Sequence, residues 1–326
     1  MKKINWGIIG CGDVTEVKSG PAFNKVADSA LVAVMRRDAA KAKDYALRHH
    51  VPCWYNDANQ LINDAAVNAV YIATPPSSHY EYALAAMEAG KPIYVEKPMA
   101  LNYMQASSMA AFSTNNNIKM VVAHYRREQP FFKKIKELLN DKIIGDILSV
   151  NLVFNKTALT PAELTESKTA WRIEPAISGG GLFHDLAPHQ LDLMYYFFGE
   201  VEQANGVAIN QAGLYHAHDL VAGHILFKNK VVFTGNWCFN ASPGGEKDHC
   251  EMIGSKGKIE FNVFGKYELI LTSNDGMKVI SFDKLEHVQQ PMIEATVNYF
   301  LDKRENPCSG EDGAVVMWMM DAMTSK

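Results

Sequence analysis

A short apolar run closes on a Gly-x-Gly turn within the first dozen residues, and this feature constrains the fold more than any other. Ile4 to Ile9 is typical of a buried strand, and Gly10-Cys11-Gly12-Asp13-Val14-Thr15 follows it at once. The first glycine permits a tight turn, and the second lets a pyrophosphate approach backbone amides at a helix start. Thr15 stands where the G-x-G-x-x-G pattern has its third glycine. The sequence therefore predicts a dinucleotide-binding turn formed by Gly10, Gly12, Asp13 and Val14.

The chain around this turn alternates between apolar runs and helical segments up to residue 123. Further apolar runs begin at Ala30, Ala69, Ile93 and Met120, and stretches with helical periodicity lie between them. Asp38 precedes one of these stretches as a helix cap. Near-continuous apolar strands that alternate with helices are typical of a parallel sheet covered on both faces. We therefore predict an α/β fold whose first domain, residues 1–123, is a doubly wound Rossmann sheet.

The pattern changes after Arg127 and predicts a second domain over residues 124–326. A helix is expected over 130–140 and a strand over 147–154. From Val201 onward, strand-like runs alternate with hairpin-like turns, and helices are expected over 291–303 and 315–323. These features indicate a C-terminal α+β domain with a mostly antiparallel sheet. A chain of 326 residues also exceeds the usual size of a single core.

Composition excludes several classes of function. The net charge of −4 leaves no broad basic surface for a nucleic-acid backbone. No apolar stretch reaches the roughly 18 residues that a membrane span needs, and the N-terminus lacks the apolar run of a signal peptide. The five cysteines are scattered and form no CxxC pair, as expected for reduced thiols in a cytoplasmic protein. We expect a soluble cytoplasmic enzyme that binds neither nucleic acid nor membrane.

The end of the second expected strand bears on the choice of cofactor. Sites that prefer NAD place an Asp or Glu there for the ribose 2′-hydroxyl, whereas an Arg accommodates a 2′-phosphate. Here Arg36 and Arg37 follow Met35, and a guanidinium pairs well with phosphate. The alternative is that these arginines are only solvated. We favour NADP(H) as the cofactor, with NAD(H) as the alternative.

Three further motifs connect the chain to a known family. They are Ala73-Thr74-Pro75-Pro76-Ser77-Ser78-His79, then Glu96-Lys97-Pro98, and then Gly179-Gly180-Gly181-x3-Asp185-x3-His189-x2-Asp192. Together with the opening glycine turn, they resemble the motifs of the Gfo/Idh/MocA family, which includes glucose–fructose oxidoreductase and inositol 2-dehydrogenase. The resemblance runs from end to end and covers both expected domains.

The resemblance implies a Rossmann domain, a C-terminal domain with a large open sheet, and catalysis in the cleft between them. It implies sugars, cyclitols or related polyols as substrates, and a homodimer or homotetramer formed through the large sheet. Lys97, Asp185 and His189 match the family's catalytic positions, and Trp171-Arg172 resembles a pair that some members place beside the nicotinamide. Tyr125 departs from the pattern, because many members have an Asn there. The remaining residues expected near the cofactor are Thr74, Pro75, His79 and Glu96.

The chemistry of alcohol oxidation explains why such residues are needed. Loss of the hydroxyl proton during hydride transfer calls for a base with a pKa near neutrality, which suits His189. The Lys97 ammonium would stabilise a developing alkoxide, and Asp185, one helical turn before His189, would orient the substrate or the imidazole. Each has a structural alternative: a solvated lysine at a strand end, a helix cap and a core histidine, respectively.

We expect no metal, because His184 and His189 are five residues apart and do not share a helix face. The leading hypothesis is an NAD(P)-dependent oxidoreductase that transfers hydride to or from a secondary hydroxyl or keto carbon. A non-catalytic dinucleotide-sensing protein and a cofactor-assisted glycoside hydrolase remain as alternatives. Substrate contacts are expected from residues 157–169, whose composition is loop-like.

Overall fold

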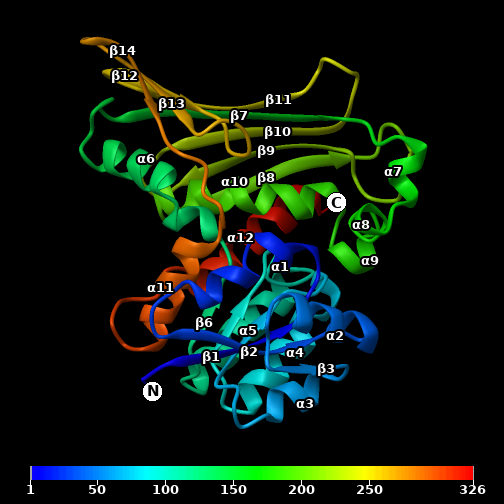
Figure 1. The fold of residues 1–326 in the computed structure, drawn as a ribbon. Helices are drawn as coiled ribbons and strands as arrows, with labels where there is room; N and C mark the ends of the chain where they lie inside the picture. Colours follow the sequence, from blue (N-terminus) through cyan, green and yellow to red (C-terminus); the bar gives the residue numbers. More distant parts are fainter. Residues whose placement is uncertain (1, 326) are drawn as a thin grey trace. The chain divides into compact units, whose positions relative to one another are not determined.

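The computed structural model describes residues 2–325 and divides the chain into two compact units (Figure 1). The first unit contains the chain up to Gln129 together with Leu285–Val315. The second contains Pro130–Lys284 and the chain from Val316 onward. A single division after residue 123 was expected, so the return of Leu285–Val315 to the first unit is a new feature.

The first unit is built on a six-stranded parallel sheet with the order β3-β2-β1-β4-β5-β6. This is the strand order of a Rossmann fold, in which ligands bind beyond the carboxyl ends of the strands, near the point where the order reverses. That point lies between β1 and β4. The strands are β1 Ile4–Ile9, β2 Ser29–Met35, β3 Cys53–Tyr55, β4 Ala69–Ile72, β5 Ile93–Val95 and β6 Met120–Val122.

Helices cover both faces of this sheet. On one face, Leu61 of α3 packs against Gly7 so closely that an added Cβ would lie 2.6 Å from its Cδ2. On the other, Trp6 packs against Phe23 and Phe300, with ring centroids 4.9 and 5.6 Å apart. The helices are α1 Asp13–Val17, α2 Ala39–Arg48, α3 Ala58–Asn63, α4 His79–Glu88, α5 Tyr103–Asn115 and α11 Gln290–Phe300, with 3₁₀ turns η1 Gly20–Asn24, η2 Pro76–Ser78 and η3 Tyr125–Glu128.

The segment Leu285–Val315 joins the first unit because it completes the core and one edge of the sheet. Helix α11 buries Met292, Ile293 and Phe300 there. Beyond it, the Cys308 carbonyl accepts a 3.0 Å hydrogen bond from the Val122 amide of the edge strand β6. An edge strand needs such a partner for its backbone groups. The chain then passes from the first unit into the second within α12 (Gly310–Thr324).

The second unit is built on an eight-stranded sheet with the order β14-β13-β12-β11-β7-β10-β9-β8. Every neighbouring pair is antiparallel except β7 and β10, which are parallel. The strands are β7 Ile147–Thr157, β8 Val201–Ile209, β9 Leu220–Phe227, β10 Val232–Ala241, β11 Lys247–Gly254, β12 Gly257–Phe261, β13 Glu268–Ser273 and β14 Gly276–Ser281.

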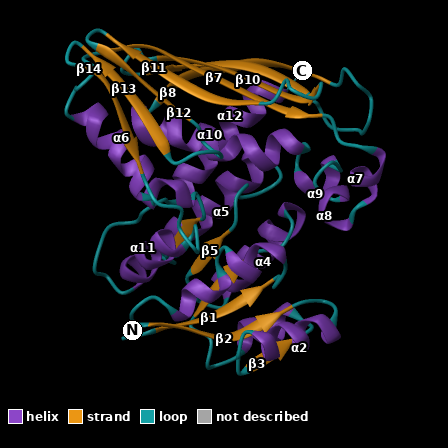
Figure 2. Ribbon diagram, turned by 45° about the horizontal axis from the view of Figure 1, so that its top comes forward, coloured by secondary structure: helices purple, strands orange, loops and turns teal. Residues whose placement is uncertain are grey.

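Helices of the second unit cover one face of its sheet, as Figure 2 shows for α6 (Pro130–Asn140) and α10 (Leu182–Phe198). Trp237 of β10 lies edge-on to Phe183 of α10 and donates a 2.6 Å hydrogen bond to Gln190. The two-unit α/β architecture confirms the predicted fold class. No helix within residues 2–325 combines the length and the apolar composition needed to cross a membrane.

The stretch expected to be loop-like contains short helices instead. They are α7 Pro161–Thr165 and α8 Ser167–Ala170, and α9 Pro175–Ser178 follows. Thr160 and Glu163 form a capping box at the start of α7, with Pro161 in the first turn. A threonine three residues before a glutamate, with proline between them, is a recognised signal for a helix start. The expectation was therefore wrong for a reason that the sequence contained.

Candidate active site

The glycine turn after β1 has the geometry that a dinucleotide needs. Gly10 has φ +93°, and an added Cβ would lie 2.8 Å from the backbone nitrogen of Thr74 after β4. Only glycine fits this turn, because other residues rarely adopt such a φ and the two strand ends approach closely. Beside Gly12 the space is open, since an added Cβ would meet only the Gly10 carbonyl at 3.9 Å. The turn therefore fits a pyrophosphate approaching the backbone.

Thr15, which replaces the third glycine of the motif, is accommodated by local hydrogen bonds. It is fully buried, and its hydroxyl donates to the Gly12 carbonyl at 2.8 Å. The Tyr45 hydroxyl of α2 donates to the Thr15 carbonyl, also at 2.8 Å. Thr15 is therefore part of the packing between turn and helix, and this departure from the motif leaves the Gly12 side of the turn open.

Two arginines follow β2. The Arg36 guanidinium donates to the Cys11 carbonyl at 3.3 Å, which places it beside the glycine turn, while Arg37 is exposed. Asp38 caps α2 by accepting a 3.1 Å hydrogen bond from the Lys41 amide. The acidic residue closest to this strand end is therefore engaged in capping. Burial raises the pKa of the Cys11 thiol to about 11, although Arg36 opposes the shift.

The segment after β4 is tied to the segment after β5 by a histidine. Thr74 accepts a 2.8 Å hydrogen bond from the Ser78 hydroxyl. Fully buried His79 has Nε2 2.7 Å from the Thr74 carbonyl and Nδ1 3.0 Å from the Pro98 carbonyl. Burial lowers the pKa of His79 to about 4, with Lys97 a minor cause. Both ring nitrogens thus face backbone, and His79 joins Thr74-Pro75 to Glu96-Lys97-Pro98.

Lys97 follows β5 at the carboxyl end of the sheet, and the side chain of its neighbour Glu96 is buried. The Glu96 carboxyl group accepts hydrogen bonds from the Tyr71 hydroxyl at 2.5 Å and the Lys97 amide at 3.2 Å. The Lys97 charge also contributes, after burial and Arg127, to lowering the pKa of His124 after β6. The first unit thus brings Lys97 to the same sheet edge as the glycine turn.

Helix α10 carries Asp185 and His189 in the second unit. The two residues are one turn apart, so they lie on the same side of the helix. Asp185 is in the first turn but does not cap it, because Gly181 is the N-cap residue. His189 is buried and lies edge-on to Phe264, with ring centroids 5.4 Å apart.

The glycines before α10 make room for a different histidine. An added Cβ at Gly180 would lie 2.1 Å from Nδ1 of His184, so the imidazole occupies the space that a side chain would fill. Burial lowers the pKa of His184 to about 4. His184 and His189 therefore contact different neighbours. Within residues 2–325, no group of His, Cys, Asp or Glu side chains is arranged to hold a metal ion.

Trp171, Arg172 and Asp185 form a connected set in the second unit. The Arg172 guanidinium lies over the Trp171 ring at 4.4 Å and donates to Asp185 Oδ2 at 3.1 Å. It also donates to the Lys168 carbonyl. A stacked and hydrogen-bonded guanidinium has little freedom, so it orients the carboxylate. Two features that were predicted separately, the Trp171-Arg172 pair and Asp185, therefore meet at one place.

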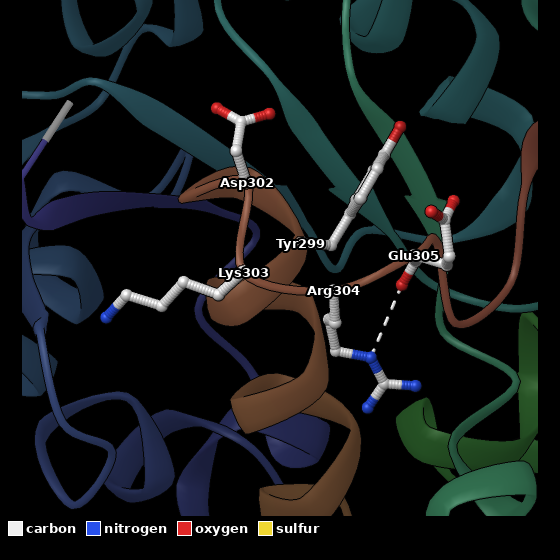
Figure 3. A pocket seen from close by; sticks show the side chains of 5 residues that line it. All are labelled: Tyr299, Asp302, Lys303, Arg304 and Glu305. Carbon is white, nitrogen blue, oxygen red and sulfur yellow. Dashed lines mark hydrogen bonds between the residues drawn. The ribbon is translucent and has the colours of Figure 1, made fainter.

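A hollow of about 370 Å³ lies elsewhere, at the end of α11 (Figure 3). The side chains of Lys303 and Arg304 point away from those of Tyr299 and Asp302. Its basic residues form ion pairs with residues outside the hollow: Lys303 with Asp28 and Arg304 with Glu128, both at 2.7 Å. None of the predicted site residues lines it, and we assign it no binding role. The residues around it are Tyr299, Asp302, Lys303, Arg304 and Glu305.

Comparison with known proteins now identifies the family. Residues 4–124 match the model of an oxidoreductase family with an NAD-binding Rossmann fold, and residues 132–260 match the GFO/IDH/MocA C-terminal domain. Oxidoreductase P35 of Formosa agariphila is 48% identical over 319 residues, which cover 98% of each chain. This chain belongs to the Gfo/Idh/MocA family. The family prediction is confirmed, and the protein is an oxidoreductase with an NAD-binding domain.

Other Gfo/Idh/MocA relatives have named activities. Levoglucosan dehydrogenase of Pseudarthrobacter phenanthrenivorans is 31% identical over 64% of this chain and 54% of its own. A solved structure of a levoglucosan dehydrogenase in complex with NADH superposes with a TM-score of 0.88 at 25% identity, covering 98% of this chain and 96% of that one. The family's two-domain architecture is therefore present throughout this chain.

Sequence reasoning missed two buried residues next to the predicted site. Tyr71 and Gln289 both donate to Glu96, but neither belongs to a motif. Tyr71 lies in an apolar strand, where a tyrosine is unremarkable. Gln289 is separated from Glu96 by 193 positions. No local pattern in the sequence could have associated it with the Glu96-Lys97-Pro98 motif.

Proposed function

We propose that the protein transfers hydride between a nicotinamide cofactor and a secondary hydroxyl or keto carbon of a sugar, cyclitol or related polyol. The observation that carries this proposal is Lys97 at the carboxyl end of β5, on the same sheet as the glycine turn. Among the relatives, levoglucosan dehydrogenase acts on a sugar derivative, which supports the substrate class.

The proposed chemistry divides the work among three residues. A bound nicotinamide would accept or supply the hydride. His189 takes the hydroxyl proton in the oxidative direction and returns it in the reductive one, an effect of about 100- to 10,000-fold on the rate. The Lys97 ammonium stabilises the negative charge that develops on the substrate oxygen. Asp185, oriented by Arg172, accepts a hydrogen bond from a substrate hydroxyl.

The same proposal assigns the cofactor contacts. Backbone groups of Gly10, Gly12, Asp13 and Val14 hold the pyrophosphate, with Thr74, Pro75 and Trp171 near the nicotinamide half. Glu96 and His79 act indirectly, because their polar atoms bond within the protein. NADP(H) is favoured over NAD(H), since Arg36 lies beside the turn and Asp38 is engaged in capping. Arg37 would assist at the 2′-phosphate from its exposed position.

We also propose that copies of the chain associate through the second unit's sheet, as a homodimer or homotetramer. One face of the sheet is covered by helices, and apolar side chains remain exposed on the strands. Apolar side chains that stay exposed on strands are available for contacts with another copy of the chain. A cytoplasmic location remains a prediction. The exposed apolar residues of these strands include Val207, Ile209, Val232, Met277 and Val279.

A turnover assay tests the proposed function. The protein is incubated with NADP⁺ or NAD⁺ and a panel of levoglucosan, glucose and myo-inositol, and absorbance of the reduced cofactor is followed. Lys97→Met should lower kcat by about 100- to 1,000-fold, the effect of removing one oxyanion-stabilising group. Lys43→Met, at an exposed position on α2, is the matched control. Equal activity of the two variants would refute the role of Lys97.

A further inference from the structure

Glu96 is the centre of a buried hydrogen-bond network that includes a residue from the far end of the chain. Gln289 Nε2 donates to Glu96 Oε1 at 2.6 Å, beside the Tyr71 hydroxyl at 2.5 Å. Gln289 Oε1 accepts a 3.1 Å hydrogen bond from the Tyr94 hydroxyl. Gln289 and both tyrosines are fully buried, and Glu96 is 5% exposed. Every member therefore depends on its protein partners for hydrogen bonds.

The network also contacts the chain just after the glycine-turn helix α1. The backbone N–H of Gln289 donates to the Lys18 carbonyl at 3.2 Å, and the Tyr71 hydroxyl lies 3.2 Å from Ser19 Oγ. Gln289 thus touches the chain that leaves the phosphate turn, and through Glu96 it touches the chain that carries Lys97. The contact with Glu96 is made by the Gln289 side chain and is lost when that side chain is replaced, whereas the contact with Lys18 is made by the backbone and remains.

The groups around Gln289 specify which way its amide points. Three donors converge on Glu96, so its oxygens act as acceptors, and the Gln289 NH₂ group must face them. Burial, followed by the Glu96 charge, raises the pKa values of Tyr71 and Tyr94 well above their ordinary range, so both hydroxyls remain protonated donors. Tyr125 and Cys308 are the other ionisable side chains close to Tyr94.

We propose that Gln289 is a positioning residue for Lys97: by holding Glu96, it fixes the backbone from which the Lys97 side chain extends. The proposal rests on the proposed function, because it assumes that Lys97 acts in the reaction. Gln289 is fully buried and acts through Glu96, not by contact with substrate or cofactor. Small displacements of a catalytic group lower the rate sharply, which is why such support matters.

Two substitutions of Gln289 separate positioning from simple packing. Gln289→Met keeps the approximate volume but removes the hydrogen bonds, and it should lower kcat by about tenfold, as expected for one lost bond to a charged group. Gln289→Glu places a second carboxyl group beside Glu96. The pair can share a proton at low pH but must repel once both are ionised. Its kcat relative to wild type should therefore fall by about tenfold per pH unit above the pKa of the shared proton.

A matched control and a rescue variant complete the design. Thr296→Val removes a different buried hydrogen bond from α11, the helix that follows Gln289: the 2.7 Å bond from the Thr296 hydroxyl to the Met292 carbonyl. It should leave kcat unchanged. Glu96→Gln combined with Gln289→Glu exchanges amide and carboxyl groups, and it should abolish the pH trend of the single variant. Tyr94→Phe, a milder change that keeps the ring, should lower kcat about threefold in the same direction.

Hydrogen exchange measured by mass spectrometry gives a readout that needs no turnover. The peptide covering residues 93–99 should exchange faster in Gln289→Met and Gln289→Glu than in wild type or Thr296→Val. Unchanged exchange would overturn the positioning role whatever the kinetics. If both Gln289 variants lost the same fraction of kcat at every pH, the positioning role would also be overturned, because a packing defect alone would explain that result.

A different outcome bears on the proposed function. If Lys97→Met keeps wild-type turnover, the proposed function fails, even where the Gln289 variants exchange faster. Should Gln289→Met not fold, Tyr94→Phe supplies the same comparison.

Discussion

The end of β5 in the first unit and the first turns of α10 in the second carry the residues proposed for catalysis, but different kinds of contact hold them. Glu96, the neighbour of Lys97, accepts a hydrogen bond from Gln289, which lies 193 positions away in the sequence. Asp185 is bonded to Arg172, only 13 positions earlier, and shares a helix with His189. The lysine thus depends on distant chain segments, whereas the acid and the histidine are arranged locally.

This difference bears on how each region should respond to mutation. A helix fixes the spacing of its own side chains, so Asp185 and His189 keep their relative positions wherever the helix forms. A strand end has no such internal constraint, and its geometry follows from what packs around it. Changes far from Lys97 in sequence should therefore affect it, while effects on α10 should come from nearby residues.

The largest expected effect is at His189. His189→Asn removes the proposed base and should lower kcat by about 100- to 10,000-fold, with a smaller change in KM. Steady-state kinetics with the best substrate of the panel measures this. His224→Asn makes the same replacement at an exposed position of the second unit and should be neutral. Similar activities for the two variants would remove the catalytic role from α10.

The next effect concerns stability and follows from His184. Burial lowers its folded-state pKa to about 4, whereas the unfolded chain has the ordinary value of 6.5. Between these values the unfolded state binds a proton that the folded state does not, so stability falls as pH decreases from 6.5 to 4. The loss from this group is about 3 kcal/mol.

Urea unfolding at several pH values tests the prediction. His184→Asn should be less stable at pH 7, because a packed ring is lost, but its stability should decline less steeply between pH 6.5 and 4. An unchanged slope would show that His184 is not the group responsible. The second unit would then lack this acid-sensitive position.

A smaller effect is expected at Arg36, whose role in the first unit was predicted from its position directly after a strand. Arg36→Ala should weaken NADP⁺ binding by about 10- to 100-fold, the range for loss of a charge-assisted hydrogen bond. NAD⁺ binding should change little. Fluorescence titrations with each cofactor therefore measure how far the variant changes the Kd for NADP⁺ relative to the Kd for NAD⁺. Equal weakening of both would indicate that Arg36 supports the glycine turn through Cys11 and does not read the 2′-phosphate.

The smallest effect is expected at Arg172. Arg172→Lys keeps the charge but loses the stacked, planar contact with Trp171 and Asp185, and it should lower kcat/KM by about tenfold. Arg304→Lys, in the first unit, serves as the control. If Arg172→Lys were as inactive as His189→Asn, Arg172 would act directly in the reaction. The roles proposed for Arg172 and Asp185 would then have to be reassigned.

Much of the fold could be predicted because its signals are local. The apolar runs, the cap at Asp38 and the helix over 130–140 all correspond to elements of the structure. The short strand β3 and helix α3 were not predicted: β3 has only three residues, none of them buried, and so few residues carry little periodicity. The boundary was also not predictable, because α11 joins the first unit through packing rather than through sequence proximity.

The sequence by itself determined the family, the glycine turn and the Asp185–His189 spacing, since each depends on residues only a few positions apart. The tertiary structure alone decided that Leu285–Val315 completes the first unit and that Gln289 supports Glu96. It also decided that His79 joins two strand ends. The physical reason is the same in each case: hydrogen bonds and packing between distant segments exist only after the chain has folded, and no local pattern encodes them.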